Sequence, residues 1–307
     1  MNELLLSLVF GVAVPVLAMA MLVPSLLDKA PKEPNFHGRL VFNGLGIVWL
    51  IWIVSIFAAS QLACLLASPI LLGQDSVWGD SQWLSLLLPA IPLLGGTVAF
   101  GLYDDWAGDS STRGFRGHLS ALARRRLTTG GLKMVGIGLL SLATGFVVFF
   151  NGTWQSAGKA VAAGAVLALS ANLMNLFDLR PGRASKAYLL GLVLVMAVWA
   201  VSIAVGYFRL SAFGAVAVAL ACIGPLLATL RFDLREIGML GDAGANSMGA
   251  VLGYLSVIAL PGWTLAVLAL VLLAFNLFAE RISFSKVIDD TPWLRKLDDL
   301  GRKSKDG

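Results

Sequence analysis

Uninterrupted apolar runs constrain this chain more than any other feature of its sequence. Stretches of about twenty residues without a charged side chain recur along its length, which is enough for a helix to cross a bilayer. Hydrophobic residues make up 58% of the chain and charged residues only 13%. A water-soluble core would instead alternate polar and apolar faces. The sequence therefore predicts an all-α polytopic membrane protein, with no room for a separate soluble domain.

The apolar runs predict about nine transmembrane helices. Residues 1–280 are expected to form one transmembrane domain. Residues 281–307 mix basic and apolar side chains, so they are expected to form an amphipathic tail on the membrane surface. The predicted spans cover approximately residues 4–26, 40–68, 83–103, 131–150, 157–177, 186–206, 210–230, 244–261 and 263–280.

Basic residues are distributed unevenly between the two sides of this topology. The loops after spans one, three, five and seven, together with the tail, hold 21 of the 23 Lys and Arg residues, and the other loops hold only Lys159 and Arg209. The positive-inside rule then places the N-terminus outside and the C-terminus in the cytoplasm. We expect a multi-pass protein of the inner or plasma membrane. Its basic face suits anionic headgroups or phosphate-bearing substrates, although each basic residue could also serve topology alone.

Four aspartates stand at the ends of apolar runs. Asp104 and Asp105 end the third run, Asp178 follows the fifth, and Asp242 precedes the eighth. The predicted topology puts all four on the cytoplasmic side. An aspartate can simply end a membrane helix, but ionisable groups close to a membrane are functional by default. Converging carboxylates suggest a divalent metal ion.

Other polar residues accompany these aspartates. Asn172, Asn175 and Asp178 are spaced by three, so they share one helix flank and should face other helices or a water-filled cleft. Gly244 follows Asp242 at a predicted helix start, where backbone can approach an anionic ligand closely. Lys133 lies at the start of the fourth span. Its side chain either extends to the membrane–water interface without a further role or contacts substrate.

The long loop after the third span carries further candidates for binding phosphate. Arg113, Arg116 and His118 lie there among glycines. Guanidinium forks and backbone donors of this kind commonly hold phosphate oxygens.

Taken together, four loop blocks resemble the polyprenyl-phosphate N-acetylhexosamine-1-phosphate transferase superfamily, which includes the translocase of peptidoglycan synthesis. The resemblance extends from about Lys32 to Glu280. Each block alone is weak, and four in family order are specific. The blocks are Lys32 with Pro34-Asn35 and Gly38, Asp104-Asp105, Asn172-x-x-Asn175-x-x-Asp178, and Gly241-Asp242-x-Gly244.

The resemblance implies an activity, a cofactor and a set of site residues. Members of this family transfer a sugar-1-phosphate from a UDP-sugar to a membrane polyprenyl phosphate with Mg²⁺ and release UMP, in cell-envelope glycan synthesis. By position, Asp104, Asp105, Asp178 and Asp242 would be catalytic, with Asp242 and Asp105 holding Mg²⁺. The substrate-binding set would include Lys32, Asn35, Asn172, Asn175 and Gly244 from the matching blocks, and Lys133 is added from its position at the start of the fourth span.

The chain departs from the family after Asp178. Leu179, Arg180 and Pro181 stand where the family continues with glycine and a second aspartate. Because Pro181 restricts its predecessor to extended backbone, Arg180 and Arg183 are expected to present guanidinium groups to a phosphate or an acidic sugar. We therefore predict that UDP-MurNAc-pentapeptide is not the donor.

Two alternatives remain open at this point. One is a family member without catalysis that binds a polyprenyl lipid or a cell-envelope partner, which the absence of histidine from residues 281–307 favours, because the family usually has a histidine cluster there. The other is a secondary transporter, which would require mid-membrane charges and repeated halves. The expected partners are the membrane, a polyprenyl phosphate and a UDP-sugar, with no nucleic acid and with a homodimer as one option for assembly.

Overall fold

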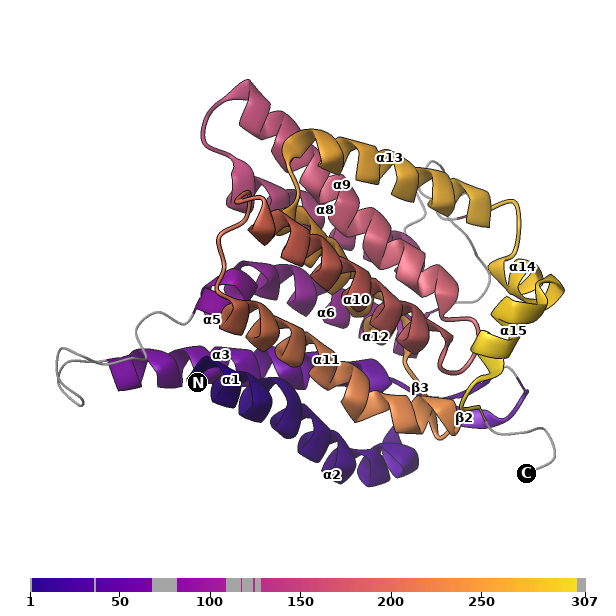
Figure 1. The fold of residues 1–307 in the computed structure, drawn as a ribbon. Coiled ribbons are helices and arrows are strands. Elements are labelled where there is room, and N and C mark those ends of the chain that lie inside the picture. The colour runs from indigo at the N-terminus through magenta and orange to yellow at the C-terminus, as the bar shows by residue number, and fades with distance from the viewer. Residues whose placement is uncertain are drawn as a thin grey trace.

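The protein is described by a computed structural model that covers residues 2–35, 37–67, 82–108 and 128–302, together with Gly117 and Arg124. Long helices lie alongside one another in a single bundle (Figure 1). Arg113, Arg116 and His118 lie outside the described residues. The elements are α1 (Asn2–Leu6), the π-helical η1 (Ser7–Ala13), α2 (Val14–Lys29), β1 (Lys32–Pro34), β2 (Leu40–Asn43), the 3-10 helix η2 (Leu45–Ile47), α3 (Val48–Ala67), α5 (Gln82–Leu87), the 3-10 helix η3 (Leu88–Ala90), α6 (Ile91–Ala107), α8 (Thr129–Phe149), α9 (Trp154–Phe177), α10 (Arg183–Ala204), α11 (Ala212–Leu234), β3 (Gly238–Met239), α12 (Gly241–Ala259), α13 (Gly262–Ala279), α14 (Phe284–Asp290) and α15 (Pro292–Asp299).

Within the described ranges, eight helical stretches are long and apolar enough to cross a membrane. Each overlaps one predicted span, so the prediction of an all-α polytopic membrane protein is confirmed. The largest shift is in the second span, which begins at Leu45 because residues 40–43 form a strand and Gly44 takes φ 138°. The stretches are Glu3–Lys29, Leu45–Leu66, Gln82–Ala107, Thr129–Phe149, Trp154–Phe177, Arg183–Ala204, Ala212–Leu234 and Gly262–Ala279.

The predicted span at 244–261 is helical as α12 but is not among these eight. Its first half carries Asp242, Asn246 and Ser247 between glycines and alanines, which lowers its hydropathy. Fourteen of its nineteen residues are buried, and it packs against α6, α9 and α10. A Cβ atom on Gly249 would clash with the backbone of Ser170 in α9. Small residues therefore let this polar helix occupy the centre of the bundle.

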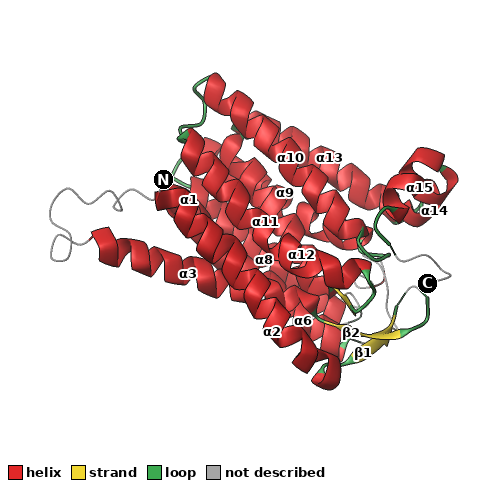
Figure 2. Cartoon of the chain, turned by 60° about the horizontal axis from the view of Figure 1, so that its bottom comes forward, coloured by secondary structure: helices red, strands yellow, loops and turns green. Residues whose placement is uncertain are grey.

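A small sheet joins two loops that are far apart in sequence (Figure 2). Strand β1 runs antiparallel to β2, with Lys32 opposite Phe42, and β2 runs parallel to β3, with Phe42 opposite Gly238. Phe42 is fully buried. The sheet fixes the first loop beside the segment that leads into Asp242.

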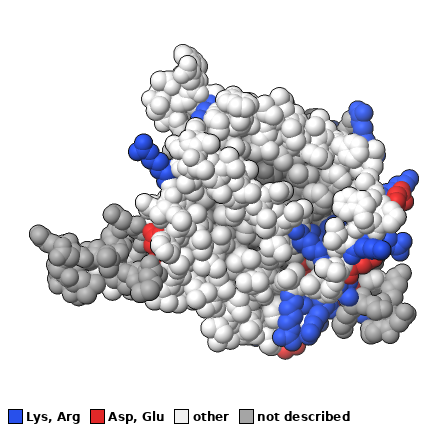
Figure 3. Space-filling model, in the orientation of Figure 1, with Lys and Arg blue, Asp and Glu red and all other residues white. Residues whose placement is uncertain are grey.

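Charged side chains gather at one end of the molecule. Figure 3 shows Lys, Arg, Asp and Glu atoms concentrated at the end that carries α14 and α15, while the middle is largely without charge. Helix α1 begins at the opposite end (Figure 1). This separation fits a bundle that crosses a membrane, since hydrocarbon excludes charge from its middle.

Candidate functional site

A cavity of about 380 Å³ opens at the charged end, and all four predicted aspartates line it. Asp104 and Asp105 end α6, Asp178 follows α9, and Asp242 lies in the first turn of α12. The expectation that these carboxylates converge on one side is therefore confirmed. The other lining residues are Glu33, Pro34, Asn35, Asn43, Gly108, Asn175, Leu179, Arg180, Pro181, Asp233, Met239 and Gly241.

Asp105 caps the N-terminus of α12. Its Oδ1 accepts from the backbone amide of Asp242 at 2.8 Å, and its Oδ2 accepts from that of Ala243 at 3.2 Å. Asn43 donates a third hydrogen bond at 3.3 Å. Gly241 makes this approach possible, because its φ is 66° and a Cβ there would clash with Asn43 and Asp105. Asp105 thus satisfies backbone donors that the start of a helix leaves open.

Asp104 instead faces Asp242 across the ammonium group of Lys133. Lys133 Nζ lies 2.7 Å from Asp104 Oδ2 and also contacts Asp242 Oδ2. Two carboxylates from different helices therefore share one cation, while Asp105 has hydrogen bonds to the backbone. Carboxylate oxygens around a shared cation suit Mg²⁺, so the donor chemistry fits the expected cofactor. Within the described ranges no three acidic, histidine or cysteine side chains form a ready-made metal site.

The polar residues at the inner end of α9 have two roles, one in helix packing and one in lining the cavity. Asn172 donates to Asn276 of α13 at 2.6 Å, which ties the two helices together. Asn175 and Asp178 line the cavity. Burial, followed by the nearby carboxylates of Asp233, Asp242 and Asp105, raises the pKa of Asp178 well above its ordinary value.

The first loop is held by Asn35. Its Oδ1 accepts from the backbone amides of His37 and Arg39, both at 2.9 Å, and its Nδ2 donates to Glu236 at 2.7 Å. His37 Nδ1 lies 2.8 Å from the same carboxylate group. Asn35 also lines the cavity, whereas the exposed Lys32 does not. Asn35 therefore shapes one wall of the cavity through its loop contacts.

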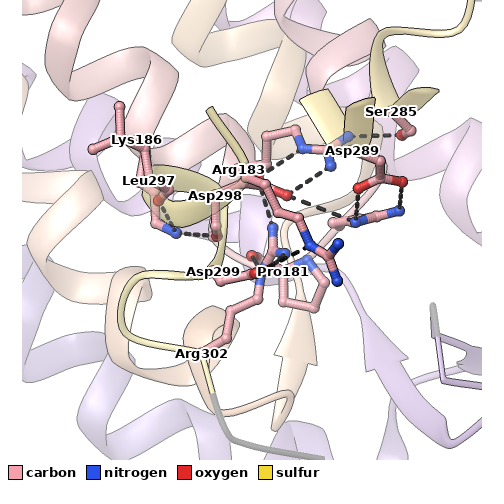
Figure 4. Close-up of polar contacts among 12 residues, drawn as sticks. Pro181, Arg183, Lys186, Ser285, Asp289, Leu297, Asp298, Asp299 and Arg302 are labelled. Atoms are coloured by element: carbon pink, nitrogen blue, oxygen red, sulfur yellow. Dashed lines mark hydrogen bonds and ion pairs between the residues drawn. The ribbon is translucent and has the colours of Figure 1, made fainter. Parts of the chain in front are cut away.

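The C-terminal tail engages both predicted arginines (Figure 4). Arg183 donates from Nε and Nη2 to Asp298 at 2.8 and 2.7 Å, and Arg302 donates to the same carboxylate at 2.8 Å. Burial alone would raise the pKa of Asp298, but these guanidinium groups outweigh it and lower the pKa to about 2. Arg180 donates to both oxygens of Asp289, at 2.7 and 2.5 Å.

These contacts change the role expected for Arg183. Its side chain is 4% exposed, it is bound to Asp298 and Ser285, and it is not among the residues that line the cavity. The substrate contact predicted for Arg183 therefore does not fit this arrangement, because its hydrogen-bonding groups face the tail. Arg180 does line the cavity, with its fork on Asp289.

A second cavity, of about 280 Å³, is lined by Lys133, whose ammonium group contacts Asp104 and Asp242 of the first cavity. Asn175 lines both cavities, and Lys133 lines the second. Apolar side chains dominate the second cavity, which adjoins α8, α9 and α13. Its lining residues are Gly130, Lys133, Met134, Ile137, Gly138, Ala168, Leu169, Asn172, Asn175, Leu176, Asn246, Leu273, Asn276, Leu277 and Glu280.

Gly244 serves packing in this structure. It is buried in α12, and a Cβ on Gly46 would clash with its backbone nitrogen. It lines neither of the two cavities described above. The ligand contact predicted for Gly244 does not fit this position, because the glycine pair instead lets η2 approach α12 closely.

Sequence reasoning missed several residues of the site. Asp233 is buried and accepts from the backbone amide of Gly182 at 3.0 Å and from Ser185 at 3.1 Å. It stands at the end of an apolar run, the signal used for the other aspartates, so it could have been found. Glu236, which does not line the cavity but accepts from the cavity residue Asn35, gave no such signal. Glu236 lies in the loop between α11 and β3, rather than at the end of an apolar run, and its φ is 55°.

The fold and the site together define a polytopic α-helical membrane protein with an acidic cavity, next to an apolar one, at its charged end. Comparison with known proteins does not narrow this class further: no protein-family model matches the chain, and no curated protein matches it significantly.

Proposed function

We propose that this chain transfers a sugar-1-phosphate from a UDP-sugar to a polyprenyl phosphate at the cytoplasmic membrane face, releasing UMP. The observation that carries the proposal is the position of Asp104, Asp242 and Lys133 between a polar cavity and an apolar one. The four loop blocks that resemble the transferase superfamily support the same conclusion.

The two cavities suit two chemically different substrates. The polar cavity offers carboxylates, amides and Arg180 to a nucleotide sugar, and the apolar cavity offers aliphatic side chains to a prenyl chain. Asn175 belongs to both, so the acceptor phosphate and the donor diphosphate would meet beside it. An acceptor lipid would enter the second cavity between helices that face the bilayer.

The reaction needs positioning and charge neutralisation more than covalent help from the protein. An oxygen of the polyprenyl phosphate attacks the β-phosphorus of the UDP-sugar, and the bond from that phosphorus to the bridging oxygen breaks, so UMP leaves with that oxygen. Asp104 and Asp242 would hold Mg²⁺, whose chemistry is to neutralise the diphosphate. Lys133, released from these carboxylates, can donate to a phosphate oxygen.

Asp105 and Asp178 have supporting roles in this proposal. By capping α12, Asp105 fixes the backbone that carries Asp242. The metal role predicted for Asp105 passes to Asp104, which shares the cation with Asp242. Asp178 lines the polar cavity, where it would contact the nucleotide or the metal.

The proposed orientation has nine crossings, an external N-terminus and a cytoplasmic tail. Counting α12 as the ninth crossing makes the number odd, in agreement with the location of α1 and α15 at opposite ends (Figure 1). By the positive-inside rule, the asymmetry of the basic residues supports a cytoplasmic position for the cavity end. The membrane would be the inner or plasma membrane of the cell.

The test is a release assay with purified protein, Mg²⁺, polyprenyl phosphate and a panel of UDP-sugars. We expect UMP with at least one donor in the wild type and none with Asp242→Asn, since an amide keeps the shape but removes the charge. No UMP with any donor would reject transfer. Binding of lipid phosphate without UMP release would favour the alternative of a protein that binds the lipid without catalysing transfer.

A further inference from the structure

The tail packs against the loop that forms one wall of the polar cavity. The ring of Phe284 in α14 stacks on Phe177 at the end of α9, with ring centroids 4.9 Å apart and planes 4° apart. Lys186 donates to the carbonyl of Leu297 at the end of α15, at 3.1 Å. The tail is therefore docked on the helix ends that carry the residues 178–183 loop (Figure 4).

One acidic residue of the tail forms a buried anchor. Asp298 has a side chain 5% exposed, and it accepts from Arg183 and Arg302. Arg302 also donates to the carbonyl of Pro181 at 2.7 Å, within the cavity wall. Removing the charge of Asp298 would leave the guanidinium groups of Arg183 and Arg302 poorly solvated and without this counter-charge. Such a change is costly in folding free energy. The contact of Arg302 with Pro181 holds the loop together with the hydrogen bonds that Asp233 accepts from Gly182 and Ser185.

A second acidic residue of the tail holds a weaker and more accessible contact. Asp289 has a side chain 37% exposed, and both its oxygens lie on the guanidinium fork of Arg180. Ion pairs in contact with water contribute little net stability. Arginine binds a phosphate in the same way, with two N–H groups of its guanidinium donating to two oxygens. Because Arg180 lines the cavity, a phosphate there could replace Asp289.

We propose that Asp289 and Asp298 are positioning residues of the polar cavity with opposite effects on ligand affinity. Asp298 keeps the 178–183 loop in place, so it favours binding. Asp289 occupies the fork of Arg180, so a diphosphate entering the cavity must displace it and loosen α14. The choice of a diphosphate as the ligand class rests on the proposed function, whereas the competition rests on the contacts alone.

Titration calorimetry with inorganic pyrophosphate and Mg²⁺ tests this inference on the full chain. The variants are Asp289→Asn, Asp298→Asn and Asp290→Asn. Asp290 is the exposed neighbour of Asp289 in α14, so its variant removes the same charge as a matched control. Hydrogen exchange of the α14 amides, with and without pyrophosphate, reports on undocking.

We expect Asp289→Asn to tighten pyrophosphate binding roughly threefold to fivefold, the scale of a solvent-exposed ion pair. Asp298→Asn should weaken binding, and Asp290→Asn should match the wild type. Pyrophosphate should speed α14 exchange in the wild type and less so in Asp289→Asn, because that variant has already lost the ion pair with Arg180. Equal effects of Asp289→Asn and Asp290→Asn, tighter binding by Asp298→Asn, or no pyrophosphate binding by any variant would overturn the inference.

The UMP assay, run in parallel, separates this inference from the proposed function. The opposite-signed binding pattern without UMP release would reject transfer and leave the competition for Arg180 intact. UMP release with affinities that do not follow the pattern would support transfer and reject the competition for Arg180.

Discussion

The carboxylate of Asp105 accepts a hydrogen bond from the backbone amide of Asp242, 2.8 Å away, although 137 residues separate the two in the chain. This bond links the end of α6 to the start of α12. It also gives the adjacent pair Asp104-Asp105 two different tasks, because Asp104 faces Lys133 instead. The two aspartates should therefore fail in different ways when changed.

Asp105→Asn should lower stability. Loss of a helix cap costs about 0.5–2 kcal/mol, and the amide cannot accept both backbone hydrogen bonds. Asp104→Asn should keep nearly wild-type stability, because Lys133 retains Asp242 as a partner, yet it should release no UMP. Thermal unfolding and the UMP assay on both variants check this. Equal stabilities for the two variants would contradict the capping role.

Lys133→Gln should tighten Mg²⁺ binding and reduce turnover. The ammonium group lies between the carboxylates that would hold the metal, so removing its charge removes a competitor for that position. The same change removes a phosphate donor from the reaction. Calorimetric titration with Mg²⁺ measures the first effect and UMP release the second. Weaker Mg²⁺ binding would show that the lysine does not compete with the metal.

Gly138→Leu should block the acceptor lipid selectively. Gly138 lines the apolar cavity, and a Cβ there meets no atom within 4 Å, so the new side chain fills the cavity without disturbing the helix. The expected result is a KM for polyprenyl phosphate raised about tenfold or more, with the KM for the donor unchanged. Gly95→Leu is the matched control, since a Cβ at Gly95 also meets open space but Gly95 lines neither cavity. A similar rise in the control would locate the lipid elsewhere.

The orientation of the chain can be read by cysteine labelling of intact cells. In a Cys64→Ser background, Leu300→Cys should resist an impermeant maleimide until the cells are permeabilised, because α15 should be cytoplasmic. Trp154→Cys, 93% exposed at the other end, should react without permeabilisation. The reverse pattern would invert the topology and place the cavity outside.

Docking of the tail should weaken in strong acid. Asp298 has its pKa lowered from 3.8 to about 2 in the folded protein, so its contribution is complete above pH 3.8 and is lost as pH falls towards 2. After allowance for solvent screening it is worth roughly 1–2 kcal/mol. Hydrogen exchange of α15 between pH 5 and pH 2 measures this as faster opening after correction for the intrinsic rate. Asp298→Asn should flatten the dependence, and an unchanged slope would contradict it.

The sequence was sufficient for those features that depend on hydropathy along one segment. Apolar runs located the eight described helices that are long and apolar enough to cross a membrane, and charges at the ends of such runs located the four aspartates that line the cavity. A spacing of three located Asn175, in the last turn of α9, and Asp178, directly after that helix, at the same cavity. In each case a local pattern determines which solvent a side chain can reach, so no partner segment is needed.

Features that depend on contacts between distant segments could not be predicted in this way. Nothing local distinguishes Asp104 from Asp105, because the start of α12 decides which of them becomes a cap. Arg183 was expected to meet a ligand, but a tail residue more than a hundred positions later satisfies it. Gly244 matched a ligand-loop pattern, and its packing against Gly46 became visible only in three dimensions.

The polarity of α12 has a consequence for how the protein is made. A helix that begins with Asp242 and carries Asn246 and Ser247 partitions poorly into lipid on its own. Its partners α6, α9 and α10 all precede it in the chain, so we expect their faces to be available for packing when α12 leaves the ribosome. Enlarging Gly249 should therefore reduce the yield of fully inserted chains before any effect on catalysis could be measured, and quality-control proteases would remove the remainder.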